Sequence, residues 1–212
     1  MTKMRIGVLV SGRGSNLAAI VDAARSGSLD VEVAVVLSDV PDAPALERAA
    51  GAGIPALYRD PGRFRTKLTP EAEAEYAEAL AGHGVQIVAL AGFMRVLHDV
   101  FLDRFAGKVV NIHPSLLPAF PGLHAQEQAL AYGVRYAGAT VHFVDAGVDA
   151  GPVILQAVVP VLPTDTAESL SARILEQEHR IYPEALQLIA EGRVLVEGRR
   201  VRILPRGEGR RP

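Results

Sequence analysis

An asparagine and a histidine stand two residues apart in the run Asn111-Ile-His-Pro-Ser115. If the expected strand Lys108–His113 forms, both side chains lie on one face at its carboxyl end. Ligands of open α/β sheets bind at that end of the strands. An amide donor beside an imidazole suits a developing oxyanion, because the amide donates without charge and the imidazole supplies charge or a proton. The alternative is that both side chains satisfy backbone groups beside a proline turn.

Two carboxylates, Asp145 and Asp149, stand four residues apart in the glycine-bearing segment Asp145–Pro152. Three interpretations stay open from their spacing: a cation site, a general base, and solvated turn residues. A carboxylate close to His113 would favour the charged form of the imidazole.

The segment Ser11-Gly-Arg-Gly-Ser-Asn16 joins an apolar run to a helical pattern. A glycine turn at the end of a strand lets backbone amides approach an anion at the helix N-terminus, which favours phosphate binding. Leu17 stands where a dinucleotide fingerprint needs its third glycine, and no P-loop lysine follows. The alternative is a tight turn in which Ser15 or Asn16 caps the helix.

Other polar residues carry weaker signals. Asp39 stands near the end of the second predicted strand, where a ribose-binding acid would sit, although a solvated turn aspartate is the commoner role. The segment Arg59–Lys67 holds three arginines, one lysine and one aspartate, which is typical of a solvated loop but also suits an anionic ligand tail. We expect no metal site, because the six histidines form no His-x-x-x-His pair. His142 is expected to be a packed or hydrogen-bonded structural histidine.

The elements that must position these residues alternate between strand and helix in the first half of the chain. The expected strands are Arg5–Val10, Val31–Leu37, Ile54–Tyr58, Val85–Ala91 and Lys108–His113. The expected helices are Asn16–Ser26, Ala43–Ala52 and Glu71–Leu80, the last with Pro70 in its first turn and Thr69 as its cap. Such alternation predicts a doubly wound, mostly parallel α/β sheet with right-handed crossovers.

The second half of the chain follows a different pattern. We expect a helix at Leu123–Tyr132, an antiparallel pair of strands at Ala139–Val144 and Val153–Val161, and a long helix at Glu168–Ala190 bent near Pro183. A hairpin is expected at Arg193–Leu204. The prediction is one domain over residues 1–204, with an N-terminal half at about 1–107, a C-terminal half at about 108–204, and a mobile tail at 205–212.

The composition of the 212 residues limits the classes of function. Apolar residues make up 49% and charged residues 22%, which is typical of a globular protein. The net charge of −2 argues against bulk attraction to nucleic acid. The absence of cysteine excludes disulfides and a thiol nucleophile. Apolar stretches such as Val85–Phe93 are shorter than the ~20 residues that span a bilayer, and we expect a cytoplasmic protein.

Several segments together resemble the phosphoribosylglycinamide formyltransferase family. The motifs, in the family's order, are Ser11-Gly-Arg-Gly-Ser-Asn-Leu17, Ala91-Gly-Phe-Met-Arg95, Asn111-Ile-His-Pro-Ser-Leu-Leu-Pro118, Pro121-Gly-Leu-His124, Val141-His-Phe-Val144, Asp149-Ala-Gly-Pro-Val-Ile-Leu-Gln156 and Gln177-Glu-His179. They extend over residues 11–179. Formyltetrahydrofolate deformylases and methionyl-tRNA formyltransferases are similar around the Asn-x-His pair but differ in their added domains, and the latter have alanine where this chain has Pro114.

The resemblance implies transfer of a formyl group from 10-formyltetrahydrofolate to the amine of glycinamide ribonucleotide, in purine synthesis. It makes the half at about 1–107 the nucleotide-binding half and the half at about 108–204 the folate and catalytic half. It assigns catalysis to Asn111, His113 and Asp149. It assigns nucleotide binding to Gly14, Ser15, Asn16 and Glu178, and folate binding to Met94, Arg95, Val96, Leu97 and the loop Asp145–Asp149. The small molecules are the only partners that it implies, with no metal, no nucleic acid and no membrane; monomer and homodimer both stay open.

One folate-contacting arginine of the family has no clear match in this chain. Arg63, Arg65 or Lys67 could replace it, and Thr69 could occupy its aligned position. The missing thiol and the absence of a Gly-x-Ser-x-Gly elbow favour direct attack by the substrate's amine over a covalent formyl-enzyme. A non-catalytic folate or nucleotide binder and a hydrolase of the same folate are the two alternatives, and the isomer of the Leu117–Pro118 bond is left open.

Overall fold

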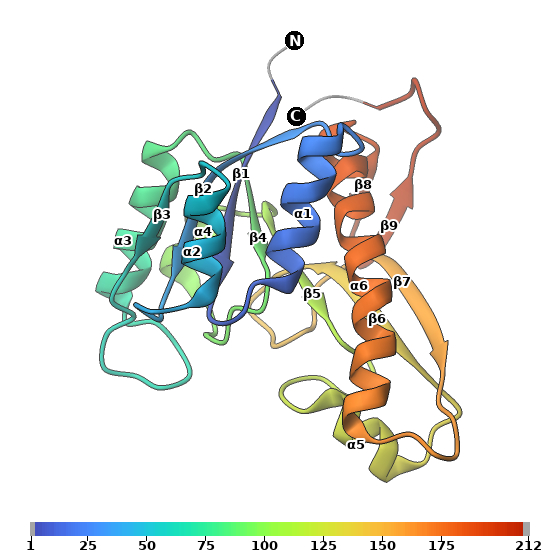
Figure 1. Ribbon diagram of the computed structural model, residues 1–212. Coiled ribbons are helices and arrows are strands. Elements are labelled where there is room, and N and C mark those ends of the chain that lie inside the picture. The colour runs from blue at the N-terminus through green and yellow to red at the C-terminus, as the bar shows by residue number, and fades with distance from the viewer. Residues whose placement is uncertain (1–2, 210–212) are drawn as a thin grey trace. The chain divides into compact units, whose positions relative to one another are not determined.

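The computed structural model describes residues 3–209 of the chain. They form two compact units that meet at the bond between Asn111 and Ile112. Figure 1 traces the elements of both units along the chain.

The first unit contains a parallel sheet. Its strands are β1 (Met4–Val10), β2 (Val31–Ser38), β3 (Ala56–Tyr58), β4 (Ile87–Leu90) and the first three residues of β5 (Val109–His113). They follow the order β3-β2-β1-β4-β5, and every neighbouring pair is parallel. β1, β2 and β4 are buried along most of their length, which is why they are continuous apolar runs in the sequence. All five strands were predicted, and the carboxyl ends of β1, β2 and β4 lie at one edge.

Four helices accompany these strands. They are α1 (Ser15–Ser26), α2 (Pro44–Gly51), α3 (Pro70–Gly82) and α4 (Asp99–Arg104). In Figure 1, α1 and α2 lie in front of the strands; α1 packs against α2, and α3 packs against α4. The predicted cap of α3 is confirmed, because the Thr69 hydroxyl accepts a hydrogen bond from the Ala72 amide at 3.2 Å.

Helix α4 is absent from the sequence prediction, and its cap explains why. The buried carboxylate of Glu73, on α3, accepts hydrogen bonds from the amide of His98 at 2.6 Å and from the amide of Phe101 at 3.2 Å. Both amides stand at the start of the helix, where backbone N–H groups lack the usual acceptor four residues earlier. A capping group on another helix leaves no local signal in the sequence.

The second unit contains the remaining elements. They are α5 (Ala125–Tyr132), β6 (Tyr136–Phe143), β7 (Val153–Pro160), α6 (Ala167–Ala190), β8 (Val194–Glu197) and β9 (Arg200–Ile203). β6 pairs with β7 and β8 pairs with β9, both antiparallel, as predicted. Helix α6 packs its apolar face on β6 and β7 and continues through Pro183, so a bend there stays a prediction. The Leu117–Pro118 peptide bond is cis.

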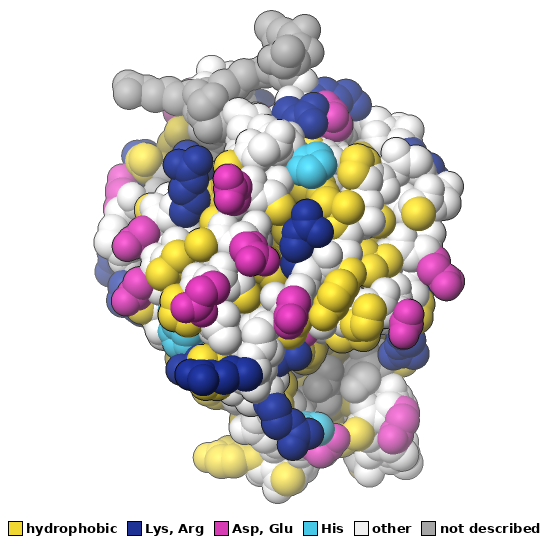
Figure 2. Space-filling model, turned by 90° about the vertical axis from the view of Figure 1, so that its left-hand side faces the viewer, with side chains coloured by type: hydrophobic (Ala, Val, Ile, Leu, Met, Phe, Trp, Pro, Cys, Tyr) yellow, Lys and Arg dark blue, Asp and Glu magenta, His cyan; other side chains and the backbone are white. Residues whose placement is uncertain are grey.

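The predicted fold class is confirmed: parallel strands with helices are followed by antiparallel strands in the C-terminal half. The single domain, its halves at 1–107 and 108–204, and the mobile tail stay predictions, and residues 210–212 of that tail lie outside the described residues. No helix among residues 3–209 is long and apolar enough to cross a membrane. On the face drawn in Figure 2, acidic and basic side chains are interspersed, in keeping with the balanced charge.

Candidate active site

His113 ends β5 and is held by two polar contacts in the second unit. The ring is buried, with Nδ1 3.3 Å from Oδ2 of Asp149 and Nε2 2.9 Å from the carbonyl oxygen of Phe120. A carbonyl oxygen only accepts hydrogen bonds, so Nε2 carries a proton. Nδ1 faces a carboxylate, which also only accepts when ionised. Both ring nitrogens of His113 therefore face hydrogen-bond acceptors.

Asp149 lies in the loop between β6 and β7, in the left-handed backbone conformation with φ 50°. Aspartate is among the few residues that adopt this region readily. Its Oδ2 accepts a hydrogen bond from the Gly122 amide at 2.8 Å, and its Oδ1 lies 3.6 Å from Nε2 of His142. Burial alone would raise the pKa of Asp149, but the contacts with His142 and Gly122 and the charge of His113 together lower that pKa below its ordinary value. Asp149 is thus a carboxylate at neutral pH.

The loop that carries Asp149 returns to β6 at Gly151, where its backbone lies close to that of Phe143. A Cβ on Gly151 would lie 1.9 Å from the carbonyl oxygen of Phe143, so only glycine fits there. The sequence prediction used this glycine only as a sign of a turn. Its packing against β6 is what returns the chain two residues after Asp149.

His142 confirms one prediction and adds a contact that was missed. The side chain is 1% exposed, and Nδ1 lies 2.8 Å from the carbonyl oxygen of Phe143, as expected of a hydrogen-bonded structural histidine. It is also the second imidazole that faces Asp149. Alternation along β6 places His142 on one face of the strand but does not show what covers that face. Within residues 3–209, no group of three or more potential ligands could hold a metal ion.

Asn111 lies two residues before His113 in β5, and it is the last residue of the first unit. Side chains two apart on a strand lie on the same face, so the shared face of this pair stays a prediction from its spacing. β5 pairs in parallel with β4, where Asn111 is opposite Leu90. Asn111 is therefore level with the last residue of β4, at the edge of the sheet where α/β folds bind ligands.

The glycine turn differs in one respect from the expectation. The N-cap of α1 is Gly14, with φ 73° and no side-chain cap, so capping by Ser15 or Asn16 is wrong. Both residues lie inside the first helical turn. A Cβ on Gly14 would lie 2.7 Å from the Cβ of Ala45, so this position needs glycine for its backbone and for its packing. The first-turn amides of α1 follow the carboxyl end of β1, as an anion site requires.

The commoner interpretation of Asp39, a solvated turn residue, is wrong. It is 5% exposed, and its two oxygens accept hydrogen bonds from Ser11 Oγ and Arg95 Nε, each at 2.6 Å. The guanidinium of Arg95, a predicted folate-binding residue, also donates to the carbonyl oxygen of Phe64. These hydrogen bonds replace the water that the buried carboxylate has lost.

The other predicted binding residues occupy different surroundings. In the first unit, Met94 has an exposed side chain, Val96 is half-buried and donates its amide to Thr66, and Leu97 belongs to the core. In the second unit, Asp145 is exposed, and its side chain accepts a hydrogen bond from the Gly147 amide at 3.0 Å. Glu178 lies on α6 and is 7% exposed.

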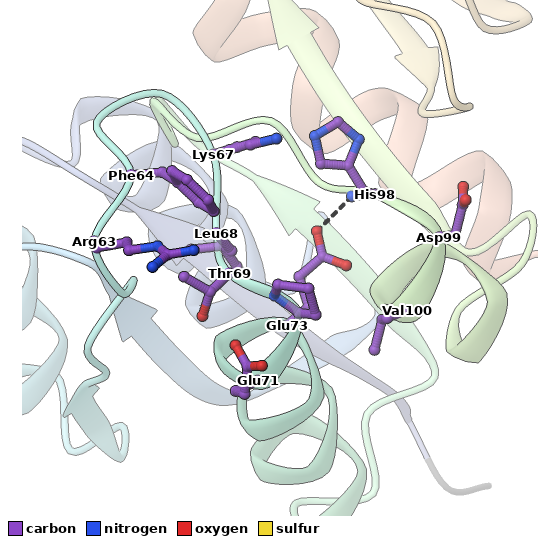
Figure 3. A pocket seen from close by; sticks show the side chains of 11 residues that line it. Arg63, Phe64, Lys67, Leu68, Thr69, Glu71, Glu73, His98, Asp99 and Val100 are labelled. Carbon is purple, nitrogen blue, oxygen red and sulfur yellow. Dashed lines mark hydrogen bonds between the residues drawn. The ribbon is translucent and has the colours of Figure 1, made fainter.

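A cavity of about 760 Å³ in the first unit is lined by two of the three candidate basic residues, Arg63 and Lys67 (Figure 3). The Arg63 guanidinium and the Lys67 ammonium lie 5.2 Å and 4.8 Å from the centre of the Phe64 ring, as cation–π pairs do. Lys67 also forms a parallel bridge with Val96, which joins the cavity wall to the predicted folate-binding run. Arg65 is not among the lining residues, and Thr69 uses its hydroxyl as the cap of α3.

Comparison with known proteins places this chain in a class. The sequence profile described as formyl transferase matches residues 4–186, which is most of the chain. That range includes the glycine turn, β5 and the loop that carries Asp149.

Individual relatives narrow the class. The chain is 43% identical over 191 residues to phosphoribosylglycinamide formyltransferase of Haemophilus influenzae, covering 90% of this chain and 89% of that protein. The crystal structure of glycinamide ribonucleotide transformylase 1 from Symbiobacterium toebii superposes with a TM-score of 0.91 at 57% identity, covering 96% of this chain and 95% of that one. The chain therefore belongs to the formyl transferases and, within them, to the phosphoribosylglycinamide formyltransferase family, as the resemblance indicated.

The family also occurs as a part of longer proteins. The chain is 45% identical over 196 residues to the trifunctional purine biosynthetic protein adenosine-3 of Drosophila melanogaster. The matched region covers 92% of this chain but only 14% of the length of that relative.

Proposed function

We propose that this chain transfers a formyl group from 10-formyltetrahydrofolate to the primary amine of glycinamide ribonucleotide, in de novo purine biosynthesis. The observation that carries the proposal is the distance of 3.3 Å between Nδ1 of His113 and Oδ2 of Asp149 in a chain of this family. His113 and Asn111 both belong to β5. The amide, imidazole and carboxylate are the groups that acyl transfer to an amine requires.

The reaction proceeds by direct attack of the neutral amine on the formyl carbon. The carbonyl π electrons move to oxygen, and the resulting tetrahedral oxyanion is stabilised by the Asn111 amide and the His113 imidazolium. The Nε2–H group of His113 faces the carbonyl oxygen of Phe120 in this structure. In the reaction it donates to the oxyanion instead. Collapse of the intermediate re-forms the carbonyl group and breaks the bond between the formyl carbon and the folate nitrogen, and this nitrogen takes up the proton that the attacking amine gives up.

Asp149 has two tasks in this scheme. Its negative charge holds His113 in the doubly protonated form, and it accepts the proton that leaves the attacking amine, through a water molecule where the distance requires one. The lowered pKa of Asp149 keeps the carboxylate ionised at neutral pH, so it is ready to take that proton.

Binding of the two substrates is assigned to separate groups. Backbone amides of Gly14, Ser15 and Asn16 hold the phosphate of the nucleotide at the start of α1, and Glu178 holds the ribose hydroxyls. The run Met94–Leu97 and the loop Asp145–Asp149 hold the folate.

Arg63 and Lys67 are proposed to meet the carboxylates of the folate's glutamate. Their support is the cavity that they line and the bridge between Lys67 and Val96. Arg95 binds the folate through its backbone, because its guanidinium is paired with the carboxylate of Asp39.

An absorbance assay separates this function from the alternatives. The protein is mixed with 10-formyltetrahydrofolate, and deformylation of the folate is followed with and without glycinamide ribonucleotide. Loss of the formyl group only in the presence of the amine supports the transferase. Loss without the amine indicates a hydrolase, and ligand binding with no change in absorbance indicates a binding protein.

A further inference from the structure

Three chain segments meet at the carboxylate of Asp39, at the carboxyl end of β2. Its Oδ1 accepts from the hydroxyl of Ser11, the first residue of the glycine turn, at 2.6 Å. Its Oδ2 accepts from Nε of Arg95, in the predicted folate-binding run, also at 2.6 Å. Arg95 in turn donates to the carbonyl oxygen of Phe64, which belongs to the cavity wall. One side chain thus connects the turn, the run and the wall.

The turn and the run are also joined directly through Ser11. Its hydroxyl accepts a hydrogen bond from the Met94 amide at 2.8 Å while donating to Asp39, and its own amide donates to Gly92 at 3.1 Å. Asp39 fixes which way the hydroxyl points, because a carboxylate only accepts. The lone pair that the Met94 amide needs is therefore presented to it.

The hydrogen bonds between Asp39 and its partners are shielded from water. The Asp39 side chain is 2% exposed and that of Arg95 is 17% exposed, so water replaces neither partner easily. A buried ion pair contributes little net stability compared with apolar residues of the same shape, but removing one partner leaves the other charge without compensation. Such a pair specifies one arrangement of the backbone around it more than it stabilises the fold.

We propose that Asp39 is a positioning residue: it holds the glycine turn and the run Met94–Leu97 in the relative placement that productive binding of both substrates needs. The inference rests on the proposed function, which gives the phosphate to the turn and the folate to the run. Asp39 touches neither substrate in this scheme. It acts through Ser11 and Arg95.

The variant Asp39→Asn tests the proposal because it keeps the shape of the side chain. The amide can still accept from Ser11 through its oxygen, but its NH₂ group then faces the donors of Arg95. We expect KM to rise about tenfold for both substrates, which corresponds to about 1.4 kcal/mol for each, while kcat changes less. The matched control is Asp42→Asn, which removes an exposed carboxylate from the same turn and is expected to leave both KM values unchanged.

Hydrogen–deuterium exchange supplies a readout that does not depend on activity. In Asp39→Asn, amides in residues 11–17 and 92–98 are expected to exchange about tenfold faster, while those of α6 keep their wild-type rates. A lowered Tm with unchanged KM values and unchanged exchange in these two segments would mean a merely structural role and would overturn the proposal. So would a variant that matches Asp42→Asn in every measurement. A wild-type protein that shows no amine-dependent reaction contradicts the proposed function instead, and the exchange experiment still tests the link between the two segments.

Discussion

Nδ1 of His113 lies 3.3 Å from Oδ2 of Asp149, although the two residues belong to different elements 36 positions apart. β5 supplies the imidazole, and the loop between β6 and β7 supplies the carboxylate in a left-handed conformation. The same carboxylate faces His142 and the Gly122 amide. The carboxylate of Asp149 therefore holds together the groups that surround the proposed catalytic imidazole.

Asn111→Ala tests the oxyanion role. Removing an amide donor from an oxyanion site lowers kcat by about 100- to 1,000-fold in comparable enzymes, and we expect a decrease in that range. Affinity for both substrates should change little, because the donor acts on charge that develops only in the transition state. Steady-state kinetics with a binding titration measure both quantities. Near-normal turnover in a folded variant would remove Asn111 from the mechanism.

Asp149→Asn tests the carboxylate without disturbing the backbone, since asparagine also adopts the left-handed conformation. Turnover is expected to fall by about 100-fold or more, in the range of general acid–base effects. Asp42→Asn, which removes an exposed carboxylate outside this loop, is the control. Equal activities of the two variants would contradict the assignment of Asp149.

The pH dependence of stability follows from the lowered pKa of Asp149. The folded chain binds this proton less readily than the unfolded chain, whose carboxyl has the ordinary value of 3.8. The contribution of the carboxylate is therefore complete above that value and is lost as the pH falls through the lower folded pKa. The free energy of unfolding of the wild type minus that of Asp149→Asn should stay constant from about pH 7 to pH 5 and decrease below about pH 4. Urea unfolding across this range measures it, and a difference that grows on acidification would show the opposite shift.

Gly14→Ala tests the glycine turn. The substitution forces a side chain into a left-handed backbone and against Ala45, and we expect a loss of about 1–3 kcal/mol in the free energy of unfolding with a raised KM for the nucleotide. Gly12→Ala is the control, because a Cβ on Gly12 meets nothing within 4 Å. Calorimetry and steady-state kinetics on both variants make the comparison. Equal Tm and KM in the two would refute the special role of Gly14.

Lys67→Met tests the cavity as the site of the folate's carboxylates. Loss of one charged hydrogen bond costs about 1.5–3 kcal/mol, so the KM for 10-formyltetrahydrofolate should rise by at least about tenfold. The KM for the nucleotide should stay the same. Arg65→Met removes a neighbouring cation that does not line the cavity and should have little effect. Equal effects of the two variants would point to general charge attraction.

Most of the fold was predictable because its signals are local. Buried parallel strands are continuous apolar runs, and Thr69 with Pro70 marks the start of α3. Helix α4 was missed because Glu73, 25 residues before His98, provides its cap. Side-chain capping at Ser15 or Asn16 was wrong because Gly14 turns the chain by itself.

The candidate site was predictable only in part. The spacing of Asn111 and His113 put them on one face, but no spacing showed that Asp149 would reach His113. That contact depends on the return of the loop at Gly151. The environment of Asp39 depends on Ser11 and Arg95, 28 and 56 positions away, so its burial had no signal in the turn itself.

The fate of the formyl carbon tests the central claim most directly. The folate is supplied with a ¹³C-labelled formyl group together with glycinamide ribonucleotide, and the products are followed by NMR. The account predicts that the label appears as the formamide of the nucleotide at the rate of folate deformylation, and that Asp149→Asn slows both together. Label released as free formate at that rate, with no formamide, would contradict it.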